Sequence, residues 1–456
     1  MLNSSRAARY TTALVVPLLL MTACGREDPS QAAGASAPPA ASAAAAPAAG
    51  AGAAADFGNA RAVCGPGTGT KPKAAGRGIS DTEINLGVIN DAKSTLAPGL
   101  GAVYLDIAKA FTTWCNEKGG INGRKLIYTS RDSNVTEAAA RVVDACQKDF
   151  MLVGGGTPFD AAMVGARAAC GMGSIPAYVA SAENRNSDKQ AVPIRAGNTQ
   201  INIGAFRRLA DKYSDAFAST GMLADDNPSV LTVTDALRKA FPQAGVKEVS
   251  YQKLPSGVAN LRTYVQPLAG KTKAFIPPLS MSVGMLRAMN DVGYKPEIIL
   301  DAVGNSYGQS LVDALKAAPT TGAYYLGLQV WPIELADQNP TLKLAVDLTK
   351  ATGTKAPIDG GIIGAWTSWL LFAQSATACT EALTVDCVIG KAKAQTSFDA
   401  GGMLSGGENV GDVEFTGDCI ALMRVTGKGY VYDRELTKPN KGIFYCDPAN
   451  VVKTSG

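Results

Sequence analysis

The chain has 456 residues, of which 43 are lysine or arginine, 39 are aspartate or glutamate and none is histidine. The length suits two or three domain-sized units, and the scattered basic residues argue against a nucleic-acid-binding face. Because histidine is absent, a Ser/His/Asp triad, a Cys/His pair and a His-ligated zinc or haem site are all excluded.

Residues 1–23 have the pattern of an export signal. Arg6 and Arg9 precede an uncharged apolar run that ends at Met21, and two small residues separate this run from Cys24. The run has about half of the roughly 20 residues that a membrane-spanning helix needs, so a retained transmembrane anchor is the weaker interpretation. The segment ending at Cys24 resembles a bacterial lipobox, although Met21 stands where leucine is usual. The resemblance implies that Cys24 is the lipidated first residue of the mature protein; ordinary cleavage nearby, leaving a soluble secreted protein, is the alternative.

Residues 24–57 are predicted to form a tether between the lipid anchor and a folded body. From Ser30 onward this segment is rich in Ala, Pro and Gly, with almost no charge and no large apolar residue before Phe57. Such a composition cannot bury a core, and the repeated Pro and Gly interrupt helix formation. No second apolar segment of spanning length follows, so the body, residues 58–456, is expected to lie outside the cytoplasmic membrane.

The body contains a further set of cysteines, an even number that suits up to four disulfides in an exported protein. None of them forms a CxxC pair, and a thiolate metal site or nucleophile is the less favoured interpretation in an oxidising compartment without histidine. Spacing alone does not give the pairing. The cysteines are Cys64, Cys115, Cys146, Cys170, Cys379, Cys387, Cys419 and Cys446.

The first part of the body alternates short strand-like runs with helical runs. In the first helical run, Val103, Ile107, Phe111 and Trp114 recur near helical spacing before the stop signal Gly119–Gly120. This alternation is typical of parallel βαβ units in an open, doubly wound sheet. The predicted strands are residues 84–91, 125–132, 150–156 and 175–181, and the predicted helices are residues 102–118, 136–147 and 158–170.

The same pattern then restarts, which predicts a second α/β unit. Residues 337–393 are predicted to be mostly helical, and the tail from Val413 to form a β-hairpin around residues 426–429. The predicted strands of the second unit are residues 229–235, 246–254, 273–279 and 297–303, and its predicted helices are residues 201–218, 236–243, 261–268 and 283–292.

Ligands of open α/β sheets bind beyond the carboxyl ends of the strands. Two such units with facing strand ends create a cleft between them. In the first unit the predicted ends are Asn90–Asp91, Gly154–Asp160 and Ala180–Ala182, and in the second they are Thr234–Asp235, Pro278–Ser280 and Asp301–Asn305.

Four segments of the body occur in an order that points to one family. They are GISDTEINLGV (Gly78–Val88), KGGINGRKL (Lys118–Leu126), VGGGTPFDA (Val153–Ala161) and LRAMNDVGYKPEIIL (Leu286–Leu300). Over about residues 78–440, and after a lipobox and a tether, they resemble the type I periplasmic solute-binding proteins of ABC transporters, in the group of Leu/Ile/Val-binding proteins. The lipid-anchored form resembles that of high-GC Gram-positive bacteria.

The resemblance implies an α/β fold of two doubly wound, Rossmann-like lobes, joined by three chain crossings and closing on a ligand by hinge motion. The crossings are expected near residues 195–199, 329–332 and 400–413. Lobe I is expected to comprise residues 58–197 and 333–405, and lobe II residues 198–332 and 406–456.

The resemblance also implies a ligand site. Gly156, Thr157, Ala180 and Ser181 are expected to hold a carboxylate through backbone and hydroxyl groups; alternatively, the glycines only permit a tight turn. Asp160 or Asp301 is expected to face a positive or hydroxyl group, although either could simply cap a helix or a loop. The lobe II loop lacks the glutamate that Leu/Ile/Val-binding proteins place against the ligand ammonium, so a branched-chain amino acid is only one candidate. The full set of predicted contacts is Asn90, Asp91, Gly156, Thr157, Phe159, Asp160, Ala180, Ser181, Leu279, Ser280, Asp301, Asn305 and Trp366.

The implied sheet order 2-1-3-4-5 places the second and third helices on one face, so Cys146 is expected to pair with Cys170. The other expected disulfides are Cys64–Cys115, Cys379–Cys387 and Cys419–Cys446, and their expected effect is rigidity rather than chemistry.

The expected function is that of a monomeric lipoprotein on the extracytoplasmic face of the membrane, which captures a small polar solute such as an amino acid and delivers it to an ABC permease. No catalysis, metal, cofactor or nucleic acid is expected. A sensor that passes ligand occupancy to a membrane receptor would use the same fold, and an exported hydrolase with paired carboxylates is the other alternative. The chain has no Walker A motif, so any ATPase is another chain.

Overall fold

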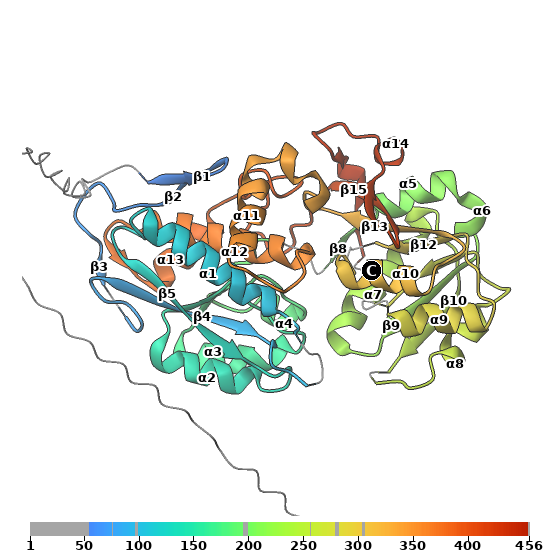
Figure 1. Ribbon diagram of the computed structural model, residues 1–456, viewed down its shortest axis with the longest axis horizontal. Helices are drawn as coiled ribbons and strands as arrows, with labels where there is room; N and C mark the ends of the chain where they lie inside the picture. Colours follow the sequence, from blue (N-terminus) through green and yellow to red (C-terminus); the bar gives the residue numbers. More distant parts are fainter. Residues whose placement is uncertain are drawn as a thin grey trace, which may run out of the picture. The chain divides into compact units, whose positions relative to one another are not determined.

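The computed structural model describes residues 54–74, 76–95, 99–194, 199–255, 257–278, 282–302 and 306–454 (Figure 1). The predicted export signal, the lipidation site Cys24 and residues 24–53 of the predicted tether lie outside these ranges. Three predicted ligand contacts, Leu279, Ser280 and Asn305, also lie outside them.

The lobe I sheet contains four parallel strands in the order β5-β4-β6-β7, which confirms the implied order 2-1-3-4. The central strand alternates its apolar side chains between two cores, because successive residues of a strand point to opposite faces. Leu86 and Val88 belong to one core and Ile89 to the other. The strands are β4 (Glu83–Asn90), β5 (Lys125–Asp132), β6 (Met151–Val153) and β7 (Gly173–Ile175).

Helices cover both faces of this sheet (Figure 1). α1 (Ala102–Glu117) and α12 (Gly360–Thr377) share one core, and α2 (Ala138–Lys148) and α3 (Met163–Cys170) share the other. The predicted apolar face of α1 is buried, and the helix ends where Gly119 follows at φ 101°, a conformation that favours glycine. Lobe I also contains β3 (Lys73–Ala74), α4 (Ala182–Arg185), α11 (Pro340–Ala351), β14 (Ala382–Leu383) and α13 (Val385–Lys393).

A hairpin formed by β1 (Ala55–Phe57) and β2 (Ala60–Cys64) precedes the lobe I sheet. Residues 55–57 were expected to belong to the tether, but Phe57 is fully buried in the core that contains α1 and α12. The folded body therefore begins earlier than the composition of the tether suggests.

The lobe II sheet contains eight strands in the order β10-β9-β11-β12-β13-β15-β16, with β17 paired to β15. The first five of this order are parallel, and β15 runs antiparallel to β13. The β15–β16 hairpin confirms the predicted hairpin of the tail. The strands are β9 (Thr220–Asp225), β10 (Glu248–Leu254), β11 (Ala274–Ile276), β12 (Ile298–Asp301), β13 (Ala323–Leu328), β15 (Cys419–Thr426), β16 (Gly429–Tyr432) and β17 (Tyr445–Cys446).

The helices of lobe II lie against this sheet, and a short antiparallel pair joins the start and the end of the lobe. In that pair, β8 (Gln200–Asn202) bonds to β18 (Val451–Lys453). The helices are α5 (Gly204–Lys212), α6 (Ser214–Phe217), α7 (Pro228–Ala240), α8 (Arg262–Val265), α9 (Val283–Asp291), α10 (Gln309–Ala317) and α14 (Arg434–Thr437).

Three predicted elements differ from the structure. Residues 229–235 were predicted as a strand because β-branched residues alternate there, but they lie in α7, which begins at Pro228, a residue that fits the first turn of a helix. The first parallel strand of lobe II is instead β9, which precedes α7. Its carboxyl end is therefore Asp225 rather than the predicted Thr234–Asp235. The predicted helix 201–218 is divided into β8, α5 and α6, and the predicted strand 175–181 ends at Ile175.

All four expected disulfides are present. Their pairs are Cys64–Cys115, Cys146–Cys170, Cys379–Cys387 and Cys419–Cys446. The first joins β2 to α1, and the second joins the C-terminal ends of α2 and α3. The third joins the segment after α12 to α13, and the fourth joins β15 to β17. Each therefore crosslinks secondary-structure elements within one lobe.

The segments expected to connect the lobes are hydrogen-bonded to one another. Trp331 N–H donates to the Met403 carbonyl (2.8 Å), and Ser405 N–H donates to the Gln329 carbonyl (3.0 Å). The Thr199 hydroxyl donates to the Glu414 carboxylate at 2.7 Å. The second and third of these segments thus lie side by side, and Thr199, at the end of the first, lies next to Glu414 just beyond the third.

In the part of the chain that the structure describes, no helix combines the length and the apolarity needed to span a membrane.

Candidate functional site

The carboxyl edge of the lobe I sheet brings together three loops. These loops follow β4, β6 and β7, as parallel strands dictate. Gly156 N–H donates to the Ile89 carbonyl (3.0 Å), and Ala177 N–H donates to the Gly155 carbonyl (2.9 Å). The predicted residues Asp91, Thr157 and Ser181 are therefore carried by neighbouring loops of one edge.

The three glycines after β6 are explained by close packing. A Cβ atom at Gly154 would lie 2.2 Å from the Trp369 indole nitrogen, and one at Gly155 would lie 2.2 Å from the Ile89 carbonyl oxygen. The Gly156 N–H is used in the sheet by its bond to Ile89. The prediction that Gly156 offers this donor to a ligand is therefore corrected, and the alternative of a tight turn accounts for the glycines.

The Asp160 carboxylate is held inside lobe I. It accepts hydrogen bonds from the backbone N–H groups of Ala180 (2.8 Å) and Ser181 (2.9 Å) and from the Asn184 side-chain amide (3.0 Å). Asp160 is only 1% exposed. Asp160 thus occupies the two backbone donors that were expected to hold a ligand carboxylate.

The Ser181 hydroxyl also has an internal role. Its oxygen accepts a hydrogen bond from Asn184 N–H (3.2 Å), which makes Ser181 the N-cap of α4. The helix is only four residues long, so this bond fixes the turn after the β7 loop. The predicted ligand contacts Ala180 and Ser181 are therefore both committed to the protein's own structure.

Arg167 supplies positive charge behind this loop. Its guanidinium is 2% exposed and donates to the Asn184 side-chain oxygen and the Ser187 hydroxyl, both at 2.9 Å. Burial lowers the pKa of Arg167 to about 10, and the nearby negative charge of Asp160 opposes this shift. The group thus remains charged at neutral pH and balances Asp160.

Two buried polar atoms at the same edge have no hydrogen-bond partner among the described residues. They are Asp91 Oδ2 and Thr157 Oγ1. Asp91 is 0% exposed and Thr157 is 1% exposed. The other Asp91 oxygen accepts bonds from the Ser133 hydroxyl and from Val135 N–H (2.6 Å). An unpaired buried acceptor costs about 1–3 kcal/mol, so these two atoms mark the place where a partner is missing.

Aromatic side chains lie in the loops of the same edge and at the start of α1. Tyr104 lies on the first turn of α1, and Tyr178 lies in the loop after β7 with 38% of its surface exposed. Burial raises the pKa of Tyr104, and Tyr178, Asp359 and Asp91 raise it further through their proximity. Phe159 is 49% exposed in the loop after β6. Neither tyrosine was among the predicted contacts, because Tyr178 was assigned to a strand and Tyr104 to a helix.

The other described residues among the predicted contacts have roles inside the protein. Asn90 is fully buried and donates to the Ser130 hydroxyl (2.9 Å), so it fixes neighbouring strand ends. Asp301, at the end of β12, accepts a bond from Ser306 N–H (2.8 Å) in its own loop. Trp366 is fully buried in the lobe I core, so its predicted place in the wall of a ligand site is corrected.

A small cavity of about 10 Å³ lies beneath the loops after β6 and β7. Its lining includes Gly156, Asp160, Met163, Tyr178 and Asn184. This volume is close to that of a single water molecule. The cavity is therefore not large enough for an organic solute.

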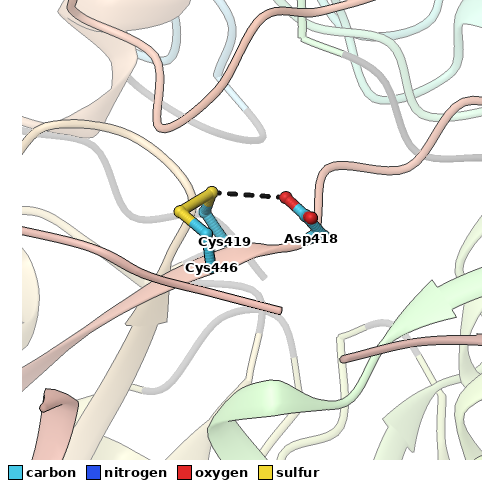
Figure 2. A group of neighbouring side chains, drawn as sticks. All are labelled: Asp418, Cys419 and Cys446. Carbon is cyan, nitrogen blue, oxygen red and sulfur yellow. Dashed lines mark hydrogen bonds between the residues drawn. A yellow bond between two sulfur atoms is a disulfide. The ribbon is translucent and has the colours of Figure 1, made fainter. Parts of the chain in front are cut away.

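A possible metal-ligand group is found in lobe II and is shown in Figure 2. Asp418, Cys419 and Cys446 lie close together, with an Asp418 oxygen 3.3 Å from the Cys419 sulfur. The two sulfurs form a disulfide and hence are not thiolate ligands. The group is a crosslink between β15 and β17.

Comparisons with known proteins agree with this architecture. The family model of the periplasmic binding proteins matches residues 83–429. The fold is similar to a fatty acid ABC transporter substrate-binding protein from Thermomonospora curvata, with a TM-score of 0.66 and 15% identity over 83% of this chain and 96% of that chain.

Two amino-acid-binding proteins have a similar fold. The branched-chain amino acid transporter substrate binding protein LivJ from Streptococcus pneumoniae, in complex with isoleucine, has a TM-score of 0.59 and 15% identity over 77% of this chain and 100% of that chain. The leucine binding protein LivK from Thermotoga maritima has a TM-score of 0.60 and 12% identity over 77% of this chain and 97% of that chain.

A search of the curated proteins finds no match. Identities of 12–15% establish only the fold, whereas the family model spans most of the chain. The chain therefore belongs to the periplasmic binding protein family, and its two lobes have the type I fold of the Leu/Ile/Val-binding proteins of ABC transporters.

Proposed function

We propose that this chain is an extracytoplasmic, lipid-anchored solute-binding protein that captures a small polar solute between its lobes and delivers it to an ABC permease. Family membership and the type I fold support a solute-binding role. The hydrogen bonds among the three crossings support closure of the lobes by a hinge.

One observation carries the proposed location of the solute. Asp91 Oδ2 and Thr157 Oγ1 are buried and lack a hydrogen-bond partner among the described residues. Both belong to the carboxyl edge of the lobe I sheet, where open α/β sheets bind their ligands. A bound solute would satisfy both atoms and remove the cost of leaving them unpaired.

The lipid anchor is the second part of the proposal. Cys24 would carry the lipid, and the segment that follows it would connect the membrane to lobe I. The folded end of this connection is firmly attached, because Phe57 is buried and Cys64 is bonded to Cys115. A body fastened in this way stays near the permease while its lobes open and close.

Equilibrium binding to the full chain, purified in detergent, tests the solute-binding role. Isothermal titration calorimetry and thermal shift would be measured with amino acids, amides, amines, aromatic acids and sugars. We expect one class to bind in a one-to-one complex, to raise the melting temperature and to be recovered chemically unchanged. Conversion of the compound into a product, or no binding by any class, would contradict the proposal.

Membrane fractionation tests the anchor separately. The wild-type protein is expected in the membrane fraction of the expressing bacterium, and Cys24→Ala is expected to move it to the soluble fraction without changing solute affinity. Equal fractionation of both proteins would refute lipidation and leave the binding role standing.

A further inference from the structure

We propose that the solute presents a protonated amine to the carboxyl edge of the lobe I sheet, and that Asp91 recognises this amine with Thr157 as a second acceptor. The inference rests on the proposed function, because it requires a solute bound at this edge. The inference adds which chemical group of the solute binds at the carboxyl edge of the lobe I sheet.

The first step is that four backbone donors of the edge are already used by the protein itself. The N–H groups of Ala180 and Ser181 bond to the Asp160 carboxylate, at 2.8 and 2.9 Å. The N–H groups of Gly154 and Gly156 bond to the carbonyls of Ile175 (3.1 Å) and Ile89 (3.0 Å). An internal carboxylate thus takes two of the donors that were expected to hold a ligand carboxylate, and these two are not free for a second anion.

The second step is that the unpaired atoms are acceptors. Asp91 Oδ2 belongs to a carboxylate, which accepts hydrogen bonds and donates none when it is ionised. Thr157 Oγ1 can accept as well as donate, and it also lacks a partner among the described residues. A group that donates several hydrogen bonds and carries positive charge matches this pair, and an ammonium is such a group.

The third step is that Tyr104 lies near two carboxylates, those of Asp91 and Asp359. Asp91 forms a backbone bridge with Leu100, which leads through Gly101 into the first turn of α1, so Asp91 and Tyr104 belong to one corner of the edge. Burial raises the pKa of Tyr104 most, and among the described residues Tyr178, Asp359 and Asp91 raise it further through their proximity.

Two described cations of the edge, Arg167 and Arg185, lie on the side of Asp160. Arg167 is bonded to Asn184 and Ser187, and Arg185 donates to the Ala180 carbonyl at 3.5 Å. The corner formed by Asp91 and Tyr104 combines carboxylates with aromatic rings, and the exposed Lys93 follows Asp91 in the same loop. Carboxylates attract ammonium groups, and a cation is also attracted to the face of an aromatic ring.

Three matched compounds separate amine recognition from carboxylate recognition. Leucine carries both groups, 3-methylbutylamine keeps only the amine, and 4-methylpentanoic acid keeps only the carboxylate on the same branched chain. Phenylalanine, 2-phenylethylamine and 3-phenylpropanoic acid form a second set with an aromatic body. The dissociation constant of each is measured by calorimetry with the full chain. We expect the amines to bind and the acids to fail.

Two variants test the assigned residues. Asp91→Asn keeps an oxygen for Ser133 and Val135 but loses the charge, and it is expected to weaken amine binding about 10- to 100-fold, the range of a hydrogen bond to a charged group. Thr157→Val is expected to weaken amine binding about 3- to 10-fold, the range of a neutral hydrogen bond. The control is Asp132→Asn at the neighbouring strand end, where Asp132 accepts backbone bonds from Lys93 and Asn134, and amine affinity is expected to stay the same.

Stability of the ligand-free protein separates binding from a structural role. Removal of an unpaired buried hydroxyl is expected to leave the melting temperature of Thr157→Val unchanged or raised. A lower melting temperature in Thr157→Val would show that its hydroxyl has an internal partner and would overturn its assignment.

The other outcomes are equally decisive. If the acids bind and the amines do not, or if Asp91→Asn binds amines as tightly as the wild type does, the inference is wrong while the solute-binding function stands. If only compounds without an amine bind, such as sugars or amides, the inference is also wrong and the solute-binding function stands. If no compound of any class binds, both the inference and the proposed function fail.

Discussion

The Phe57 ring stacks on the indole of Trp366, with ring centroids 5.0 Å apart. Phe57 belongs to the hairpin that precedes the region matched by the family model, whereas Trp366 lies in the centre of the lobe I core. A segment outside the family match is therefore part of the core that supports the site.

Phe57→Ala is expected to lower the free energy of unfolding by about 3–5 kcal/mol, the usual range for a buried Phe reduced to Ala. The ring is 0% exposed and also meets Trp114 edge-on at 4.8 Å, so its removal leaves a cavity between two helices. Urea unfolding followed by tryptophan fluorescence measures the change. Phe159→Ala is the matched control, because Phe159 is 49% exposed and its loss is expected to cost less than about 1 kcal/mol. Similar losses in the two variants would contradict the packing argument.

The four disulfides are expected to differ in their contribution to stability. A crosslink restricts the unfolded chain more when it closes a longer loop. Cys64–Cys115 spans 51 residues and Cys379–Cys387 spans 8, which corresponds to about 4 and about 2.5 kcal/mol in the chain-entropy model. Thermal melting of the two double-serine variants would show the larger decrease for Cys64 and Cys115, and the reverse order would exclude loop closure as the main effect.

Much of the fold was predictable because its periodicity is strong. β4, α1 and β5 were predicted within one or two residues of their bounds, and the sheet order followed from the resemblance. The segment that forms α7 was not predictable, since its β-branched residues favour a strand and only packing next to β9 selects the helix. The pairing of β8 with β18 joins residues about 250 positions apart, which local patterns do not reveal.

The candidate site was predictable in position but not in role. The sequence located Asp91, Thr157 and Asp160 at the correct edge, because strand ends follow from the strand assignments. It did not show that Asp160 bonds to Ala180 and Ser181, since that contact joins two loops about 20 residues apart whose approach depends on the packed structure. Tyr178 was not predictable as a site residue, because the apolar run extends past the true end of β7 at Ile175.

Asp160→Asn is expected to lower the free energy of unfolding by about 2–3 kcal/mol, since an amide replaces a charged acceptor and turns an N–H group toward other donors. Its control is Asp144→Asn on α2, where the carboxylate is 47% exposed and its ion pair with Arg141 is worth less than about 1 kcal/mol. Denaturant unfolding measures both. An Asp160→Asn variant as stable as the wild type would show that the carboxylate is not required by the loop.

Asp359 is expected to make stability depend on pH. Its carboxylate caps α12 by accepting a bond from Gly361 N–H (3.0 Å), but burial raises its pKa above the ordinary value of 3.8. Below pH 3.8 the group is protonated in both the folded and the unfolded chain, and burial then carries no charge penalty. As the pH rises from 3.8 through the higher folded pKa, the unfolded chain ionises first, and the folded state loses relative stability.

Asp359→Asn keeps a capping oxygen and cannot ionise, so it is expected to be as stable as the wild type at pH 3 and more stable at pH 7. Melting temperatures from pH 3 to pH 7 measure this difference, which should grow with pH and then level off. Asp359→Ala serves as the matched variant, because it removes both the charge and the cap and should be less stable than Asp359→Asn by about 1 kcal/mol at every pH. A stability difference between Asp359→Asn and the wild type that does not change with pH would show that burial leaves the ionisation of Asp359 unaffected.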